Sequence, residues 1–175
     1  MRHLFYTSFF LFLTACICPD FEPPDAVEGL RPLYLPAESL DLISTQDPRT
    51  LSTPTDFSFY GDYLLAMEKY QGIYVLDNTD PTQPSALYFW DIPGIVSYTT
   101  QGEILYADNA IDLLVINMSD PSQIRVLTKL ANIYDGSNTA LFPENFIGFF
   151  ECVDTTRGVV IGWETVELES PKCQR

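Results

Sequence analysis

A stretch of 25 residues occurs twice in this chain, forty positions apart, and no other sequence feature constrains the fold as strongly. Residues 63–87 align without a gap on residues 103–127, and the apolar positions of the two copies coincide. Each copy has two apolar or aromatic runs separated by a polar turn, then an Asp-Pro pair and a third run, and a further run precedes each copy. Such runs predict strands, and about four strands per unit is typical of a β-propeller blade.

We therefore expect an all-β fold of antiparallel repeat blades of about 40 residues. The units are predicted at about 56–94 and 95–131, with a degenerate third unit at 132–175. A closed propeller needs at least about four blades, so three units indicate an incomplete propeller-like stack, or a ring closed by self-association. An antiparallel sandwich with coincidentally similar hairpins is the alternative fold.

The N-terminus has the pattern of an export signal. Arg2 and His3 precede an apolar stretch that ends in small residues. A membrane-spanning helix needs about twenty apolar residues, and this run is shorter, so residues 1–15 are predicted to be a cleaved signal peptide. A buried N-terminal helix or strand is the other interpretation.

The signal ends in the sequence LTAC at Cys16, which resembles the bacterial lipobox. This resemblance implies cleavage before Cys16 and acylation of its thiol, and two or three acyl chains anchor a protein firmly to a membrane. Ile17 stands where the inner-membrane retention signal has aspartate, which favours the outer membrane, facing the periplasm or the cell surface. The alternative is that Cys16 forms a disulfide in a secreted domain, and the presence of nearby Cys18 supports this alternative.

The mature chain is expected to have two parts. Residues 16–50 are rich in proline and acidic residues, which predicts a lipid-anchored tether and an N-terminal cap, and residues 51–175 form the β repeat domain. The whole chain carries 24 acidic and 9 basic residues, a formal net charge of -15. Nucleic acid is excluded as a partner because phosphates need a basic surface.

Cys152 and Cys173 are the expected disulfide pair, because export implies an oxidising compartment. Two free buried thiols, or a metal site, are the alternatives. A metal site has neither a histidine nor a close cysteine pair to complete it.

The repeat region resembles the LVIVD repeats of bacterial, especially Bacteroidetes, β-propeller-like lipoproteins. The stretches that carry the resemblance are GIYVLDNTDPTQP, the IPG at residues 92–94, LYADNAIDLLVINMSDPSQI and FFECVDTTRGVVIGWE, so it covers roughly residues 56–175. The resemblance implies a repeat-built envelope protein and no particular biochemical role.

Catalysis has little support in the sequence. The only histidine, His3, leaves with the signal peptide, which excludes Ser-His-Asp and Cys-His nucleophiles and histidine-bound metals from the mature chain. There is no phosphate-binding loop or dinucleotide motif, so neither a catalytic residue nor a cofactor is expected. Glu68 and Asp108 fall at equivalent positions of the ungapped repeat, and a carboxylate-dependent hydrolase would need such a pair.

Hard oxygen ligands for calcium are available in the turns, although the spacing is not that of an EF-hand. The candidates, which also have a purely structural explanation as turn residues, are Asp77, Asn78, Asp80 and Asp112.

We expect a lipid-anchored cell-envelope protein that acts as a non-enzymatic binding or scaffolding module. Its partners are membrane lipid through acylated Cys16 and either an envelope protein or a further copy of the chain. A surface glycan-binding protein, using Trp90 or Trp163, is the main alternative, and a hydrolase is the lesser one.

Overall fold

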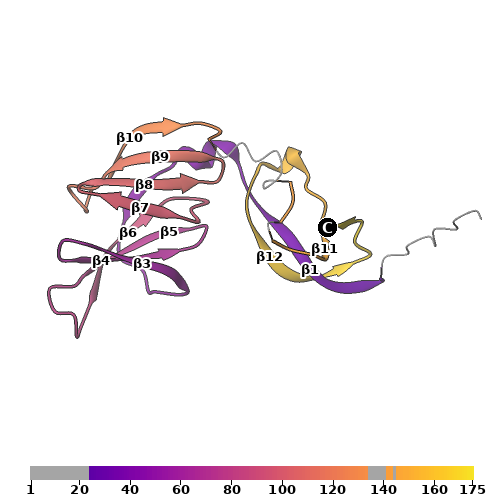
Figure 1. Cartoon of the computed structure of the whole chain (residues 1–175), viewed down its shortest axis with the longest axis horizontal. Coiled ribbons are helices and arrows are strands. Elements are labelled where there is room, and N and C mark those ends of the chain that lie inside the picture. Colours follow the sequence, from indigo (N-terminus) through magenta and orange to yellow (C-terminus); the bar gives the residue numbers. More distant parts are fainter. Residues whose placement is uncertain (1–23, 134–140, 144) are drawn as a thin grey trace, which may run out of the picture.

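The computed structural model describes residues 24–133, 141–143 and 145–175, which form three β-sheets and no α-helix (Figure 1). Of the strand pairs, one is parallel and the others are antiparallel. The expected all-β fold with antiparallel sheets is therefore confirmed. Two short 3-10 helices, η1 (Ala37–Asp41) and η2 (Thr155–Arg157), lie in the connections.

The first sheet has five antiparallel strands in the order β2-β6-β5-β4-β3. Four of them follow one another along the chain as a meander, and β2 joins the sheet at the free edge of β6. Their bounds are β2 Ser44–Gln46, β3 Pro54–Tyr60, β4 Tyr63–Glu68, β5 Gly72–Asp77 and β6 Ser85–Asp91.

The second sheet repeats the meander without the added strand, in the order β10-β9-β8-β7. Its strands are β7 Tyr98–Gln101, β8 Ile104–Asn109, β9 Asp112–Asn117 and β10 Arg125–Leu130. The edge of β10 that corresponds to the β2 position is consequently unpaired within the part of the chain that the structure describes.

The same side-chain chemistry turns the chain after the third strand of each meander. Asp77 Oδ1 accepts hydrogen bonds from the backbone N and the hydroxyl of Thr79, and Asn117 Oδ1 does the same for Ser119. Aspartate and asparagine favour such local bonds to the backbone two residues on. The repeat in the sequence is thus a repeat of turn geometry as well as of strands.

The two meanders differ by one residue in one hairpin turn. In the β4–β5 hairpin Glu68 pairs with Gly72, whereas in the β8–β9 hairpin Asn109 pairs with Asp112, so the second turn is one residue shorter. Positions before this turn therefore correspond at a spacing of 41, and positions after it at 40. The ungapped alignment is wrong for the strand before the turn, and Glu68 corresponds to Asn109 rather than to Asp108.

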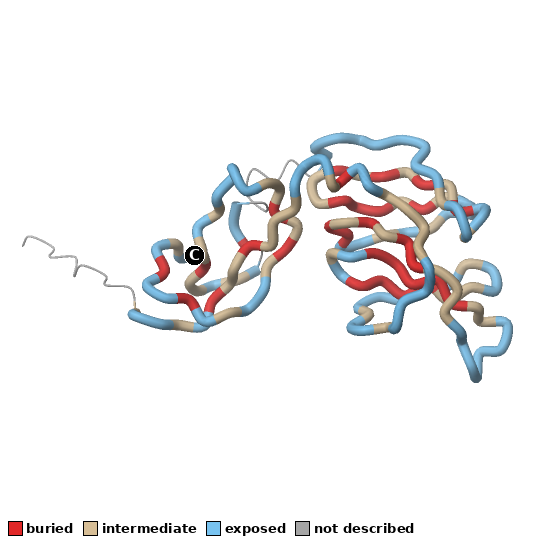
Figure 2. Tube along the Cα trace, turned by 180° about the vertical axis from the view of Figure 1, so that it is seen from behind, coloured by how far each residue is buried: buried red, intermediate tan, exposed pale blue. Residues whose placement is uncertain are grey.

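The largest apolar core lies between the facing surfaces of the first and second sheets, where the buried strands are drawn in red (Figure 2). Trp90 is fully buried there, and its Nε1 donates a hydrogen bond to the carbonyl of Pro121 at 2.9 Å. The Tyr98 hydroxyl lies 2.8 Å from Ser58 Oγ across the same interface. The cluster comprises Leu65, Met67, Ile73, Val75, Trp90, Ile92, Ile95, Leu105, Ala107, Leu114, Ile116 and Met118.

The third sheet corrects two expectations about the ends of the chain. Its order is β12-β1-β11-β13, with β1 and β11 parallel, so residues 132–175 are not a third copy of the meander. Residues 16–50 are not an unpaired tether throughout, because β1 pairs along its whole length with β12. The strands are β1 Ala26–Leu35, β11 Phe149–Phe150, β12 Val159–Glu169 and β13 Cys173–Gln174.

The expected disulfide between Cys152 and Cys173 is confirmed, with the two Cα atoms 5.3 Å apart. It joins the segment after β11 to β13, and these strands pair through Phe150 and Cys173. The covalent link therefore reinforces the β13 edge of the third sheet, where β13 pairs with β11 over only two residues.

Replacement of both Cys152 and Cys173 by alanine should loosen this sheet selectively. In the chain-entropy model, a disulfide closing a loop of about twenty residues stabilises by roughly 3 kcal/mol. Amide hydrogen exchange should show the opening free energy of β11 and β12 falling by about that amount, while β5 and β8 keep theirs. An equal loss in all three sheets would contradict this expectation.

Candidate functional site

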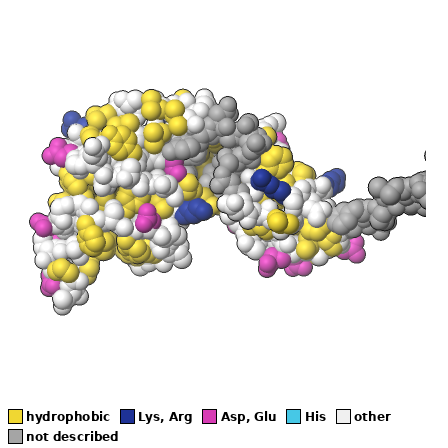
Figure 3. Space-filling model, viewed as in Figure 1, with side chains coloured by type: hydrophobic (Ala, Val, Ile, Leu, Met, Phe, Trp, Pro, Cys, Tyr) yellow, Lys and Arg dark blue, Asp and Glu magenta, His cyan; other side chains and the backbone are white. Residues whose placement is uncertain are grey.

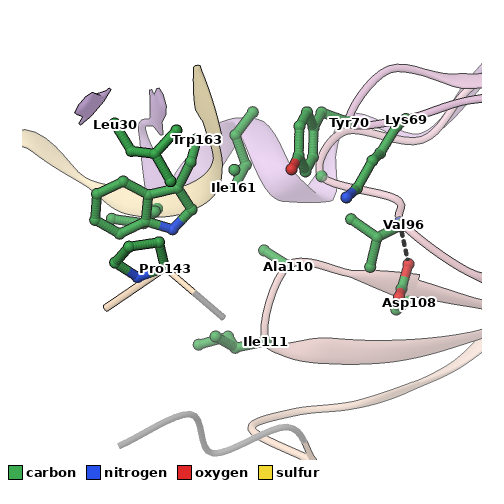
Figure 4. Close-up of a pocket in the computed structure, with 13 residues that line it drawn as sticks. Leu30, Lys69, Tyr70, Val96, Asp108, Ala110, Ile111, Pro143, Ile161 and Trp163 are labelled. Atoms are coloured by element: carbon green, nitrogen blue, oxygen red, sulfur yellow. Dashed lines mark hydrogen bonds between the residues drawn. The ribbon is translucent and has the colours of Figure 1, made fainter. Parts of the chain in front are cut away.

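A cleft of about 510 Å³ opens where the hairpin tips of the first and second sheets meet β1 and β12 (Figure 4). Segments that are far apart in the sequence meet here, and most of the lining is apolar or aromatic. The lining residues are Leu30, Lys69, Tyr70, Gly94, Val96, Asp108, Ala110, Ile111, Pro143, Val160, Ile161, Gly162 and Trp163.

Tyr70 joins the first sheet to the third sheet at one side of the cleft. It lies in the β4–β5 turn with a φ of 69°, and its backbone N donates to Ile95 O at 2.6 Å. Its ring packs so closely on β12 that a Cβ atom at Gly162 would lie 2.3 Å from Tyr70 Cζ. A side chain at position 162 would therefore displace the Tyr70 ring from this contact.

Asp108 is the buried carboxylate of the cleft. Its Oδ1 accepts hydrogen bonds from the backbone N of Val96 at 2.6 Å and of Ser97 at 3.0 Å. Burial raises the pKa of Asp108 above its ordinary value, while these two bonds and the nearby Lys69 charge act in the opposite direction. The cleft thus offers a carboxylate and an ammonium group beside apolar walls, a combination suited to orienting a ligand.

Trp163 forms an aromatic wall of the cleft, as Figure 4 shows. Its ring is perpendicular to that of Phe150, at 5.7 Å between centroids, and this contact holds it in place. Trp90, the other tryptophan expected to contact glycans, is fully buried in the core between the first two sheets. The expectation for Trp90 is therefore wrong, and that for Trp163 stays a prediction.

Glu68 does not line the cleft. It is buried elsewhere and accepts hydrogen bonds from the Tyr74 hydroxyl and from Gln71 Nε2, the latter at 3.1 Å. The carboxylate pair that the hydrolase alternative needs is therefore divided between two environments, with Asp108 in the cleft and Glu68 outside it.

Two of the proposed calcium ligands are already bonded within their own turns. Asp77 Oδ1 accepts from Thr79, and Asp80 Oδ1 accepts from the backbone N and the hydroxyl of Thr82 at 3.0 and 2.7 Å. These bonds lower the pKa of both carboxyl groups. Each has a structural role that needs no ion.

Of the other two candidates, Asp112 has side-chain partners in the protein. The buried Asp112 pairs with Lys129 Nζ at 2.9 Å and accepts from the backbone N of Asn132 at 2.8 Å. The backbone N of Asn78 donates to Asp62 O, which fixes the backbone of Asn78 but does not engage its side-chain oxygen. Within the described ranges, no group of three or more His, Cys, Asp or Glu residues is arranged to hold a metal ion.

Residues 1–15, Cys16 and Cys18 lie outside the described residues, so the signal peptide and the lipid attachment stay predictions. Among the residues that are described, no helix has the length and apolar character needed to cross a membrane.

The comparisons with known proteins give no family and no relative. No family model matches the chain, and no curated protein or solved structure is significantly similar to it.

Substitution of Asp108 by asparagine tests the cost of its burial. Because folding raises the pKa of Asp108 above its ordinary value of 3.8, its contribution to stability is fully present below that value and is lost as the pH rises through the folded-state pKa. Asparagine can accept both backbone bonds without a charge. Urea unfolding should therefore find Asp108→Asn at least as stable as the parent at pH 7, with this relative advantage shrinking in acid. A parent that is more stable than the variant at pH 7 would contradict this.

Proposed function

We propose that this protein is a lipid-anchored cell-envelope protein that acts as a non-enzymatic binding or scaffolding module, with the cleft as its ligand site. The observation that carries the binding role is the composition of the cleft, whose apolar and aromatic walls surround a few convergent polar groups. Ligand sites in proteins commonly have this composition. The lipid anchor rests on the resemblance of LTAC at residues 13–16 to a lipobox.

We further propose that the first and second sheets are two blades of an incomplete propeller-like stack of LVIVD type. Their shared meander order, their similar turns and their face-to-face core support this assignment. Blades hold loops and hairpin tips at defined positions, and in this chain the tips carry Lys69 and Ile111 into the cleft. The stack would thus present the ligand site on a rigid support.

An envelope protein is the favoured ligand, and a glycan is the alternative. The glycan alternative rests on Trp163, because sugar rings stack on exposed faces of aromatic side chains. A hydrolase is less favoured, since Asp108 is the one carboxylate among the described lining residues. The charge of -15 on the chain favours a partner with a basic surface and disfavours one with a strongly acidic surface.

The anchor is tested by the variant Cys16→Ala. Without the thiol there is no site for the acyl chains that provide membrane affinity of about 0.8 kcal/mol per buried methylene. The variant should retain its signal peptide when exposed to lipoprotein signal peptidase, and it should not incorporate labelled palmitate. Cys18→Ala is the matched control and should behave as the parent. Unchanged palmitate labelling of Cys16→Ala would refute the anchor.

The ligand site is tested by photo-crosslinking in intact cells. A photoreactive residue at Ile111, inside the cleft, is compared with one at Ile147, which is 91% exposed and lies outside the cleft. We expect an adduct of defined mass at position 111 that is absent at position 147, and that weakens at least several-fold when Lys69→Ala is added. Protease or glycosidase sensitivity of the adduct then separates a protein ligand from a glycan. Identical adducts at both positions would show that the cleft is not the site.

A further inference from the structure

We infer that copies of this chain associate head to tail, with the open face of the second sheet packing on the outer face of the first sheet of another copy. The inference goes beyond the proposed function, because it depends on neither the cleft nor the lipid anchor. Its basis is that the interface between the two sheets is one step of a repeating arrangement that this chain leaves incomplete at both ends.

The existing interface is directional, since the two sheets contribute different surfaces to it. The first sheet faces the second with Leu65, Ile73 and Val75, and the second sheet faces the first with Leu105, Leu114 and Ile116. The pairing registers show the difference: Leu65 pairs with Val75, whereas Leu105 pairs with Ile116. A third sheet of the same kind would therefore pack on the second as the second packs on the first.

The open face of the second sheet, which we call the front face, carries the residues needed to receive such a sheet. With the one-residue difference in the hairpin turn, four first-sheet core residues map onto apolar residues of the front face, whereas Met67 maps onto Asp108, which lines the cleft. The correspondences are Leu65 to Tyr106, Ile73 to Leu113, Val75 to Val115 and Trp90 to Leu130. None of these front-face residues lines the cleft, and Leu130 is 42% exposed.

The outer face of the first sheet, which we call the back face, carries the complementary residues. Its members correspond to second-sheet residues that pack against the first sheet: Leu64 to Leu105, Ala66 to Ala107 and Phe57 to Tyr98. Phe57 and Phe59 are 55% and 69% exposed on this face, which is unusual for phenylalanine. They are the aromatic residues that a second copy would cover.

Part of the back face is already covered by the chain itself. Leu51 packs against the cluster of Ala66, Tyr74, Leu76 and Phe89, and the guanidinium of Arg49 lies 4.0 Å from the Phe89 ring centroid. This covering reaches β5, β6 and Ala66 of β4, but it leaves Phe57 and Phe59 on β3 exposed. The surface that remains for a second copy is therefore the β3 edge of the back face.

The two faces lie at opposite ends of the stack formed by the first and second sheets. Hydrophobic side chains are visible over β10 at one end and over β3 and β4 at the other (Figure 3). Because different surfaces meet, the contact is heterologous, and it continues from copy to copy, giving a ring where the rotation closes and an open filament where it does not. Each copy brings two sheets, so about two to four copies supply the four to eight blades of typical closed propellers.

The arrangement of the two sheets predicts one specific contact between copies, between Phe57 of one copy and Thr99 of another. Within the chain, Tyr98 of β7 lies against Ser58 of β3. The same step applied to the next copy places its Phe57 opposite Thr99 of this copy, and Thr99 is exposed. Since Phe57 faces away from the second sheet of its own chain, a crosslink between these positions reports on association rather than on the fold of one chain.

The experiment uses the full chain in intact cells, expressed as two copies that carry different epitope tags. A photoreactive residue replaces Phe57 in one copy, and mass spectrometry locates the crosslinked peptide in the other. We expect crosslinks to residues 98–106, and loss of at least nine-tenths of the crosslinked product when Leu130→Lys is introduced into the second copy. Ile147→Lys in the second copy is the matched control and should leave the yield unchanged.

A second measurement records the mass of the purified full chain in detergent as the salt concentration rises. The net charge of -15 makes copies repel each other, and salt screens this repulsion. The oligomer population should therefore grow between 0.05 and 0.5 M salt, a range over which the Debye length shortens from about 14 Å to about 4 Å. A monomer at every salt concentration, crosslinks between two Phe57 positions, or crosslinks only to another protein would each overturn head-to-tail association.

Discussion

The apolar contact between the first and second sheets is the interaction on which the repeat part of this protein depends. Each sheet has an apolar surface that must be buried, and a single sheet cannot do this alone. Trp90 fills the interface and ties it to the Asp-Pro turn of the other meander through Pro121. The same contact fixes the hairpin tips beside each other, so the cleft that holds Lys69 and Asp108 is a consequence of this packing.

The sequence was sufficient to predict the strands of the two meanders and the disulfide, but it could not show which face each strand presents. Leu65 and Leu105 look equivalent in an ungapped alignment, yet one faces the second sheet and the other faces the first. Successive strand residues point to opposite faces, so a turn shorter by one residue reverses the surface. Glu68 and Asp108 were matched for the same reason, and the structure gives them different partners.

The third sheet and the cleft escaped prediction because they depend on contacts that are distant in the sequence. Proline argues against an interior strand, because it has no backbone N–H to donate to a neighbouring strand. However, β11 pairs with β1 only at Leu30, so at Pro32 the strand β1 has a single neighbour, β12. The sequence around Tyr70 and Gly162 does not indicate that they are in contact. Neither the positive φ of Tyr70 nor the close approach of its ring to Gly162 can be predicted from the neighbouring residues. Asp108 was selected as half of a pair with Glu68, and what distinguishes it from Glu68 is its place in the lining of the cleft.

The pairing of β1 with β12 has a consequence for the order in which this protein can fold. These strands are more than one hundred residues apart in the sequence, and β1 is synthesised long before β12. Contacts between segments that are distant in the sequence form slowly, because the entropy cost of closing a long loop comes before the contacts can stabilise the fold. The two meanders are built from neighbouring strands and can form first, while β1 stays an exposed edge until β12 has been synthesised. For that interval a chaperone, or a strand of another molecule, has access to β1.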